Sequence, residues 1–129
     1  MFNQKKYQKE NRWKYKGKYK EYQLWYNKKR RKQLAKRQKK VNLEIKKLVL
    51  MYYGNGKLEC TLCGYKNIVA LSLDHISGNG AEDRKKTGKS GQMFYRHLIK
   101  NKFPGGLRTL CMNCQWIEKD RLANLKIVV

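Results

Sequence analysis

The chain has 129 residues, enough for one compact domain and an appendage, because a single core needs only about 100 residues. It carries 32 Lys and Arg against nine Asp and Glu, a formal net charge of +23 that exceeds what solubility requires. The first 20 residues are polar, and the longest apolar run, Leu48–Tyr53, has six residues. Neither resembles a secretion signal or a membrane span. We therefore expect an intracellular protein that binds nucleic acid and not a membrane.

The N-terminal part combines positive charge with aromatic residues. Residues 1–50 contain 19 basic and three acidic residues, one glycine and no proline. This composition favours a helix, or a tail that becomes helical on a partner. Tyr15, Tyr19, Tyr22 and Tyr26 recur at spacings of four, three and four, so on a helix they would form one stripe. Two compatible interpretations are open: the stripe packs on the rest of the chain or a partner, or it binds nucleic acid with the neighbouring lysines.

The segment 28–40 is the most basic run of the chain, with nine Lys or Arg among its 13 residues. Repulsion between these charges predicts poor order in the absence of a counter-charge. We expect its charged side chains to bind nucleic acid, together with Arg84 further along the chain. The charged residues of the run are Lys28, Lys29, Arg30, Arg31, Lys32, Lys36, Arg37, Lys39 and Lys40.

The pattern changes at Val41, where apolar residues begin to recur at helical spacing up to Tyr52. This periodicity predicts a helix that docks on the domain that follows. The segment Gly54-Asn55-Gly56 is typical of a helix end. We therefore divide the chain into a basic, aromatic-rich helical extension over residues 1–53 and a domain over residues 54–129.

Four cysteines form two CxxC pairs in this domain. Cys60 and Cys63 precede a glycine. Cys111 comes 48 positions after Cys63, and Cys114 comes three positions after Cys111. Each tight turn offers two thiolates, and four thiolates complete the tetrahedral coordination that zinc prefers. Two disulfides or a redox-active CxxC are the alternatives, and both fit poorly with a chain that has no secretion signal. The pattern predicts one structural zinc site that contributes much of the folding free energy of this small domain.

Between the cysteine pairs, Leu71–Ile76 alternates apolar and polar residues, which predicts a half-buried strand. Asp74 and His75 would point to opposite faces of a regular strand, so they can share a site only where the strand ends or bulges. The glycines at 78 and 80 permit such a break. A carboxylate can hold a divalent cation while an imidazole takes a proton from water, although a pair at a strand end is more often a capping interaction.

The remaining segments complete a mixed α+β pattern. We expect Ala81–Ser90 to be a charged loop and Gln92–Asn101 to be a short helix that stops before a Phe-Pro-Gly-Gly turn. Leu107–Leu110 is predicted to be a second strand. A final helix begins near Cys111, and its periodicity predicts three inward side chains, those of Trp116, Ile117 and Leu122.

The succession CTLCG, LSLDHI with its glycine turn, FYRHLIKNKFPGG and LRTLCMNC resembles the zinc-bearing HNH endonucleases of bacteriophages and mobile introns, over about residues 58–120. The resemblance implies a ββα-metal fold (a His-Me finger) that hydrolyses phosphodiesters in nucleic acid, DNA in most cases. It implies that His75 is the general base and that Asp74 binds a catalytic divalent ion such as Mg²⁺. A further ligand would come from the helix after the second cysteine pair, at Gln115, while the four cysteines hold structural zinc.

Three positions depart from the family pattern. Gln115 stands where the family has His or Asn, and its stem is one methylene longer than that of Asn. Glu118 stands where a Lys is common, and the middle Asn of the motif falls near Gly106. A second hypothesis therefore stays open, a catalytically degenerate HNH-fold zinc protein that acts as a structural RNA- or DNA-binding component of a ribonucleoprotein.

Overall fold

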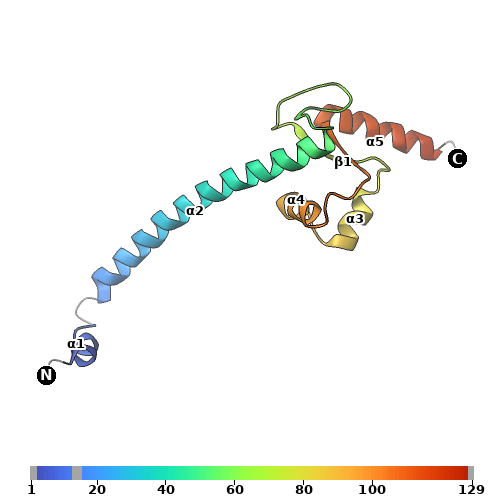
Figure 1. Cartoon of the computed structure of the whole chain (residues 1–129). Coiled ribbons are helices and arrows are strands. Elements are labelled where there is room, and N and C mark those ends of the chain that lie inside the picture. Colours follow the sequence, from blue (N-terminus) through green and yellow to red (C-terminus); the bar gives the residue numbers. More distant parts are fainter. Residues whose placement is uncertain (1–2, 13–15, 128–129) are drawn as a thin grey trace. The chain divides into compact units, whose positions relative to one another are not determined.

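The computed structural model of the chain describes residues 3–12 and 16–127 (Figure 1). They contain helices and a two-stranded antiparallel sheet, as the mixed α+β pattern predicts. The chain forms two compact units, residues 1–40 and 41–129. Within the described residues, no helix combines the length and the apolar character needed to cross a membrane.

The first unit is helical. Helix α1 spans Gln4–Asn11, and the side chain of Asn3 caps it by accepting a hydrogen bond from the backbone N–H of Lys6 (3.1 Å). Helix α2 spans Lys16–Tyr53 and belongs to this unit up to residue 40. The basic run 28–40 is helical throughout, so its predicted disorder is wrong. The run consists of strong helix formers, namely Lys, Arg, Gln, Leu and Ala, and its charged side chains are exposed to water. Tyr15 of the predicted stripe lies outside the described residues.

The last turns of α2 belong to the second unit and contribute to its core. Val49 and Leu50 are fully buried there, and Tyr53 donates a hydrogen bond to the carbonyl oxygen of Pro104 (2.6 Å). The helix ends at Tyr53, directly before Gly54, as predicted. A Cβ added there would lie 2.2 Å from the carbonyl oxygen of Lys57, so only glycine allows the chain to turn back this tightly.

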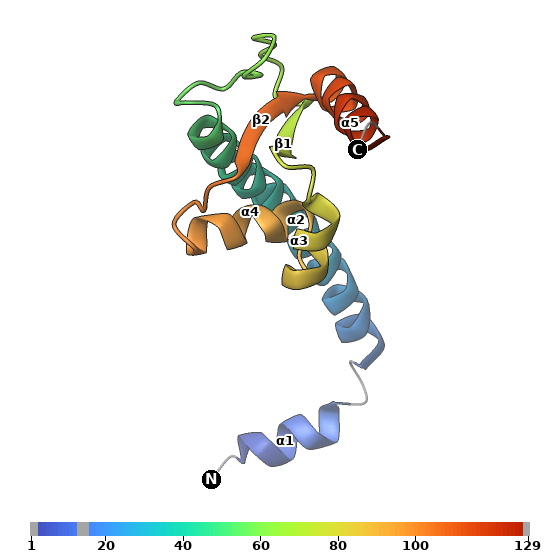
Figure 2. The same cartoon turned by 90° about the vertical axis from the view of Figure 1, so that its right-hand side faces the viewer.

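The sheet consists of β1 (Leu71–His75) and β2 (Leu107–Cys111), both close to their predicted bounds. Residue 74 lies opposite residue 108, and residue 75 lies opposite residue 107. Helix α5 (Met112–Ile127) follows β2 without a loop and lies beside the strands (Figure 2). Because side chains alternate along a strand, the sheet has an apolar face with Leu71 and Leu73 and a more polar face with Ser72 and Asp74.

Two short helices connect the strands. Helix α4 (Gly91–Lys100) confirms the predicted helix, and its buried Leu98 packs with Val49 and Tyr53 against the apolar face. Helix α3 spans Gly80–Thr87, so the loop predicted over Ala81–Ser90 is wrong for residues 81–87 and confirmed only for residues 88–90. Two acidic residues in its first turn and three basic residues in its last turn complement the helix dipole, which explains how a charged segment without apolar periodicity forms a helix.

Helix α5 turns a different face inward from the predicted one. Trp116 and Ile117 are each 65% exposed, so only Leu122 of the three predicted inward side chains is partly buried. The half-buried positions include Gln115 and Glu118, which have polar side chains. They meet the polar face of the sheet, where hydrogen-bonding partners compensate for their partial burial.

Candidate functional site

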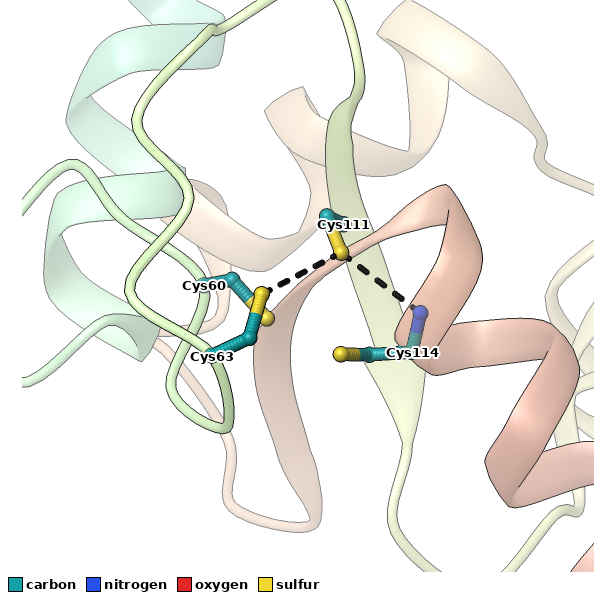
Figure 3. Close-up of side chains that lie close together, drawn as sticks. All are labelled: Cys60, Cys63, Cys111 and Cys114. Atoms are coloured by element: carbon teal, nitrogen blue, oxygen red, sulfur yellow. Dashed lines mark hydrogen bonds between the residues drawn. The ribbon is translucent and has the colours of Figure 1, made fainter.

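The four cysteines meet at one point, although 54 positions separate the first from the last (Figure 3). Cys60 and Cys63 lie on the loop before β1, Cys111 ends β2, and Cys114 lies in the first turn of α5. Their sulfur atoms all lie within 4.8 Å of one another, and the thiols are free. Across the described residues, this is the one place where at least three potential metal ligands of the His, Cys, Asp and Glu types meet.

The spacing of the sulfurs fits a tetrahedral metal and not a disulfide. The Sγ atoms of Cys63 and Cys111 are 3.6 Å apart. A zinc ion with Zn–S bonds of about 2.3 Å holds its sulfur ligands about 3.8 Å apart, whereas a disulfide brings them to about 2.05 Å. The cluster can therefore hold a metal ion such as zinc, as the CxxC spacing predicts.

The electrostatics of the thiols also favour a cation. Burial raises the pKa of Cys60, but hydrogen bonds from the backbone of Cys111, Cys63 and Leu62 outweigh this effect and lower that pKa to about 6. At Cys114, burial and then the neighbouring thiols raise the pKa well above its usual range. Four thiolates this close repel one another strongly, so all four ionise together only when a cation compensates their charge.

Backbone hydrogen bonds shape the first cysteine turn. The N–H of Gly64 donates to the carbonyl oxygen of Cys60 (2.9 Å), and the N–H of Cys60 donates to that of Tyr65 (2.8 Å). Gly64 has φ +75°, a conformation that explains the glycine after the second cysteine. Thr61 donates to the carbonyl oxygen of Thr109 through both its N–H (3.0 Å) and its hydroxyl group (3.1 Å). The turn is therefore attached to β2 independently of a metal.

A groove of about 620 Å³ lies at the end of the sheet, between β1, the start of α3 and α5. Asp74, His75 and Gln115 all contribute to its lining. Asp74 and His75 point to opposite faces of the sheet and Gln115 comes from α5, and the three meet there because β1 ends at His75. Three basic residues also line the groove, one from α3 and two from α5, namely Arg84, Lys119 and Lys126.

Asp74 forms an ion pair in this groove. The Nε atom of Arg108, directly opposite on β2, donates to Oδ2 of Asp74 (2.9 Å), and its Nη2 donates to Oε2 of Glu118 (2.9 Å). Hydrogen bonds from Arg121 and then Arg108 lower the pKa of Glu118 to about 2. Asp74 therefore belongs to a chain of alternating charges that joins both strands to α5.

His75 points to the other face and pairs with Asp83 of α3. The Nε2 atom lies 3.2 Å from Oδ2 of Asp83, and the ring lies 5.8 Å from that of Phe94. An ionised carboxylate only accepts hydrogen bonds, so Nε2 carries the proton and Nδ1 of the neutral ring is the basic nitrogen. A Cβ on Gly80 would lie 2.9 Å from this Nδ1, so the backbone of α3 closely approaches the basic atom.

Gln115 bonds to β1 through its amide nitrogen. Nε2 donates to the hydroxyl oxygen of Ser72 and, at 3.4 Å, to the carbonyl oxygen of Leu73. A carbonyl cannot donate, so these contacts fix the orientation of the amide and leave its oxygen available to another partner.

The basic residues predicted to bind nucleic acid lie on two elements. The nine from the run 28–40 are all exposed on α2. Arg84 is exposed on α3 and lines the groove with Asp74 and His75. Arg84 and the nine residues of α2 belong to different compact units.

Two residues that contact Asp74 and His75, namely Arg108 and Asp83, were not predicted from the sequence. Asp83 lies in a segment assigned to a loop, and its helical spacing after Gly80 appears only once α3 is recognised. Arg108 could have been found from the predicted strand pairing, because the register places it opposite Asp74. Asp83 lies outside the motifs of the sequence, whereas Arg108 lies within LRTLCMNC.

Comparison of the chain with models of protein families, with curated proteins and with solved structures finds no match.

Proposed function

We propose that the chain is a zinc-stabilised, HNH-type endonuclease that hydrolyses phosphodiesters of nucleic acid, DNA in the first instance. The observation that carries the proposal is that Asp74, His75 and Gln115 line one groove with three basic residues. A base, two oxygen ligands and a cationic rim are the groups that phosphodiester hydrolysis requires.

The order of elements supports a ββα-metal assignment. The first strand ends at the Asp-His pair, and a helix follows the second strand directly. The cysteine cluster joins the loop before β1 to the end of β2 and the start of α5. Zinc at this cluster would be structural, because four thiolates leave no open coordination position.

Asp74 and Gln115 fit the ligand types of a magnesium-like ion. Carboxylate and amide oxygens suit such an ion, and the orientation of Gln115 leaves its oxygen free of the sheet. Arg108 bonds to one oxygen of Asp74, as outer-shell partners of ligating carboxylates commonly do. A divalent ion bound by these oxygens would supply positive charge that offsets the charge developing on the phosphate and the leaving oxygen.

The chain's own residues provide the proton transfer. Asp83 holds the proton on Nε2 of His75, so Nδ1 is free to accept a proton from water. The water oxygen then forms a bond to phosphorus, and the bond from phosphorus to one sugar oxygen breaks. That oxygen leaves with the bonding electron pair and takes up a proton from solvent. Arg84, Lys119 and Lys126 line the groove and would hold the phosphate backbone in place during this step.

A nicking assay tests the proposal. Purified protein with zinc and added Mg²⁺ should nick supercoiled plasmid, and His75→Ala should lower the rate at least 100-fold. His97→Ala is the matched control, because His97 is the other histidine of the chain and contacts Lys89 and Asn101 instead of Asp83. Equal nicking rates for His75→Ala and His97→Ala would refute the role of His75.

The second candidate function is a nucleic-acid-binding protein of the same fold that does not cleave, for example within a ribonucleoprotein. The Arg108–Asp74 ion pair favours it, because a guanidinium group at 2.9 Å already compensates the carboxylate charge that would attract a cation. Wild-type protein that binds nucleic acid but does not bind Mn²⁺ or cleave would support this candidate over the nuclease.

A further inference from the structure

One exposed face of α2 carries three aromatic rings, and the ring of Tyr22 lies next to each of the other two. The rings of Tyr22 and Tyr26 are nearly parallel, at 19°, with centroids 6.2 Å apart. Trp25 lies 6.0 Å from Tyr22, and the Nζ of Lys29 lies 5.0 Å above the Trp25 ring. The side chains remain between 44% and 56% exposed, so the rings are available to a ligand.

Positive charges continue this face toward the C-terminus of α2. A shallow groove that begins at the three rings is also lined by Lys29, Arg30 and Arg37, with Gln33 and Leu34 between them. Residues 1–40 contain 17 Lys and Arg against two Asp and Glu, so the surrounding surface strongly attracts polyanions. Here "ring face" denotes Tyr22, Trp25, Tyr26 and Lys29.

We propose that the ring face binds unpaired bases of single-stranded nucleic acid, with the cations of the groove on the adjacent phosphates. Aromatic rings stack on any base, and cations contact the backbone without sequence preference. The nearly parallel rings of Tyr22 and Tyr26 and the exposed ring of Trp25 offer surfaces on which bases can stack.

The charges on this face argue against another copy of the chain as the occupant. Two such helices packed through the ring face would bring Lys29, Arg30 and Arg37 of each copy together, and like charges at an interface oppose association. Duplex nucleic acid fits the cations equally well, but its base faces are already stacked on one another and would not engage the rings. The partner is the same class of molecule as in the proposed function, but this site does not depend on cleavage by His75.

The test measures binding by full-length His75→Ala protein with zinc and without added Mg²⁺. The probes are fluorescent T12 and U12 oligonucleotides, a duplex of the same length, and dextran sulfate as a polyanion without bases. We expect the single strands to bind more tightly than the duplex, and Tyr22→Leu, Trp25→Leu and Tyr26→Leu each to weaken them by about 5- to 150-fold. Tyr19→Leu is the matched control, because Tyr19 is exposed on the same helix and does not line the groove.

A second readout reports stacking directly. In a Trp13→Phe, Trp116→Phe background, Trp25 is the only tryptophan, and a stacked base should quench its fluorescence. Lys28→Gln is the charge control for Lys29→Gln, because Lys28 does not line the groove. Lys29→Gln should lower the salt slope for single strands by about 0.7 and change the quenching, whereas Lys28→Gln should do neither. Comparison of T12 with U12 shows whether DNA or RNA is preferred, and either preference agrees with the proposal.

Three results would overturn it. One is equal affinity of the protein for single strand, duplex and dextran sulfate. Another is that the ring variants and Tyr19→Leu bind the single strands with equal affinity. The third is concentration-dependent dimerisation, in analytical ultracentrifugation, that Tyr26→Leu abolishes. Circular dichroism at 222 nm confirms that each variant keeps its helix. A positive result with no plasmid nicking by wild-type protein would leave this site standing and refute only the nuclease.

Discussion

The Nε atom of Arg108 lies 2.9 Å from Oδ2 of Asp74, directly across the sheet, and the same guanidinium group bonds to Glu118. This arrangement places a cation beside the carboxylate that the resemblance assigns to a metal. Its consequence depends on whether Arg108 orients Asp74 for a divalent ion or replaces that ion.

Arg108→Gln separates these two roles. If Arg108 orients Asp74, the variant should bind Mn²⁺ about 10- to 100-fold more weakly than wild type, as losses of outer-shell partners typically do. If Arg108 replaces the ion, wild type should not bind Mn²⁺ and the variant should gain binding. Calorimetry with Mn²⁺ provides the measurement, and Arg121→Gln is the control because Arg121 contacts Glu118 and not Asp74 in these ion pairs.

The cysteine cluster predicts that metal removal unfolds the second unit. Cys60→Ser should lose the metal and the cooperative thermal transition, because the cluster joins the loop before β1 to β2 and α5. Elemental analysis should find one zinc per wild-type chain. Met112→Ser is the control, since Met112 lies within the second CxxC but is 47% exposed and is not a ligand. Retention of the wild-type transition by Cys60→Ser would contradict a structural metal.

Glu118 predicts a specific acid response. Its pKa is lowered to about 2 by Arg121 and Arg108, below the ordinary value of 4.5. A group with a lowered pKa in the folded state stabilises the fold above its ordinary pKa, and this contribution disappears as the pH falls toward the lowered value. Carbon-13 NMR of the side-chain carboxyl should therefore find Glu118 still ionised at pH 4. Arg121→Gln should shift its titration toward higher pH, and an unchanged titration would show that the ion pair is not formed in solution.

The close approach of Gly80 to His75 predicts a selective loss of activity. In Gly80→Ala the new Cβ would lie 2.9 Å from Nδ1, so the imidazole must move. Because a small misplacement of a catalytic group can lower a rate by about 100-fold, nicking should fall by 10- to 100-fold while the melting temperature changes little. Gly105→Ala is the control, because a Cβ at Gly105 meets no atom within 4 Å. Equal nicking by both variants would argue against Nδ1 as the base.

Much of the secondary structure follows from local chemistry. Lys, Arg, Gln and Leu favour the long helix, and Gly54 ends it. Alternation predicts the strand that begins at Leu71, and the two CxxC pairs predict the cluster because each tight turn already brings two thiols together. Apart from the meeting of the two cysteine pairs, which are 48 positions apart, these features depend on neighbours within a few positions, so the sequence by itself determines them.

The contents of the groove depend instead on the tertiary structure. The sheet register brings Arg108 to Asp74 across 34 positions, and helix α3 brings Asp83 to His75. The apolar periodicity of α5 predicted two of its three inward side chains wrongly. The face of the sheet that α5 contacts is polar, so Glu118 and not Trp116 points toward it. The sequence by itself determines which side chains follow one another along the chain. Only the packing of strands against helices decides which of them form ion pairs and hydrogen bonds, because these partners are set by distance in space.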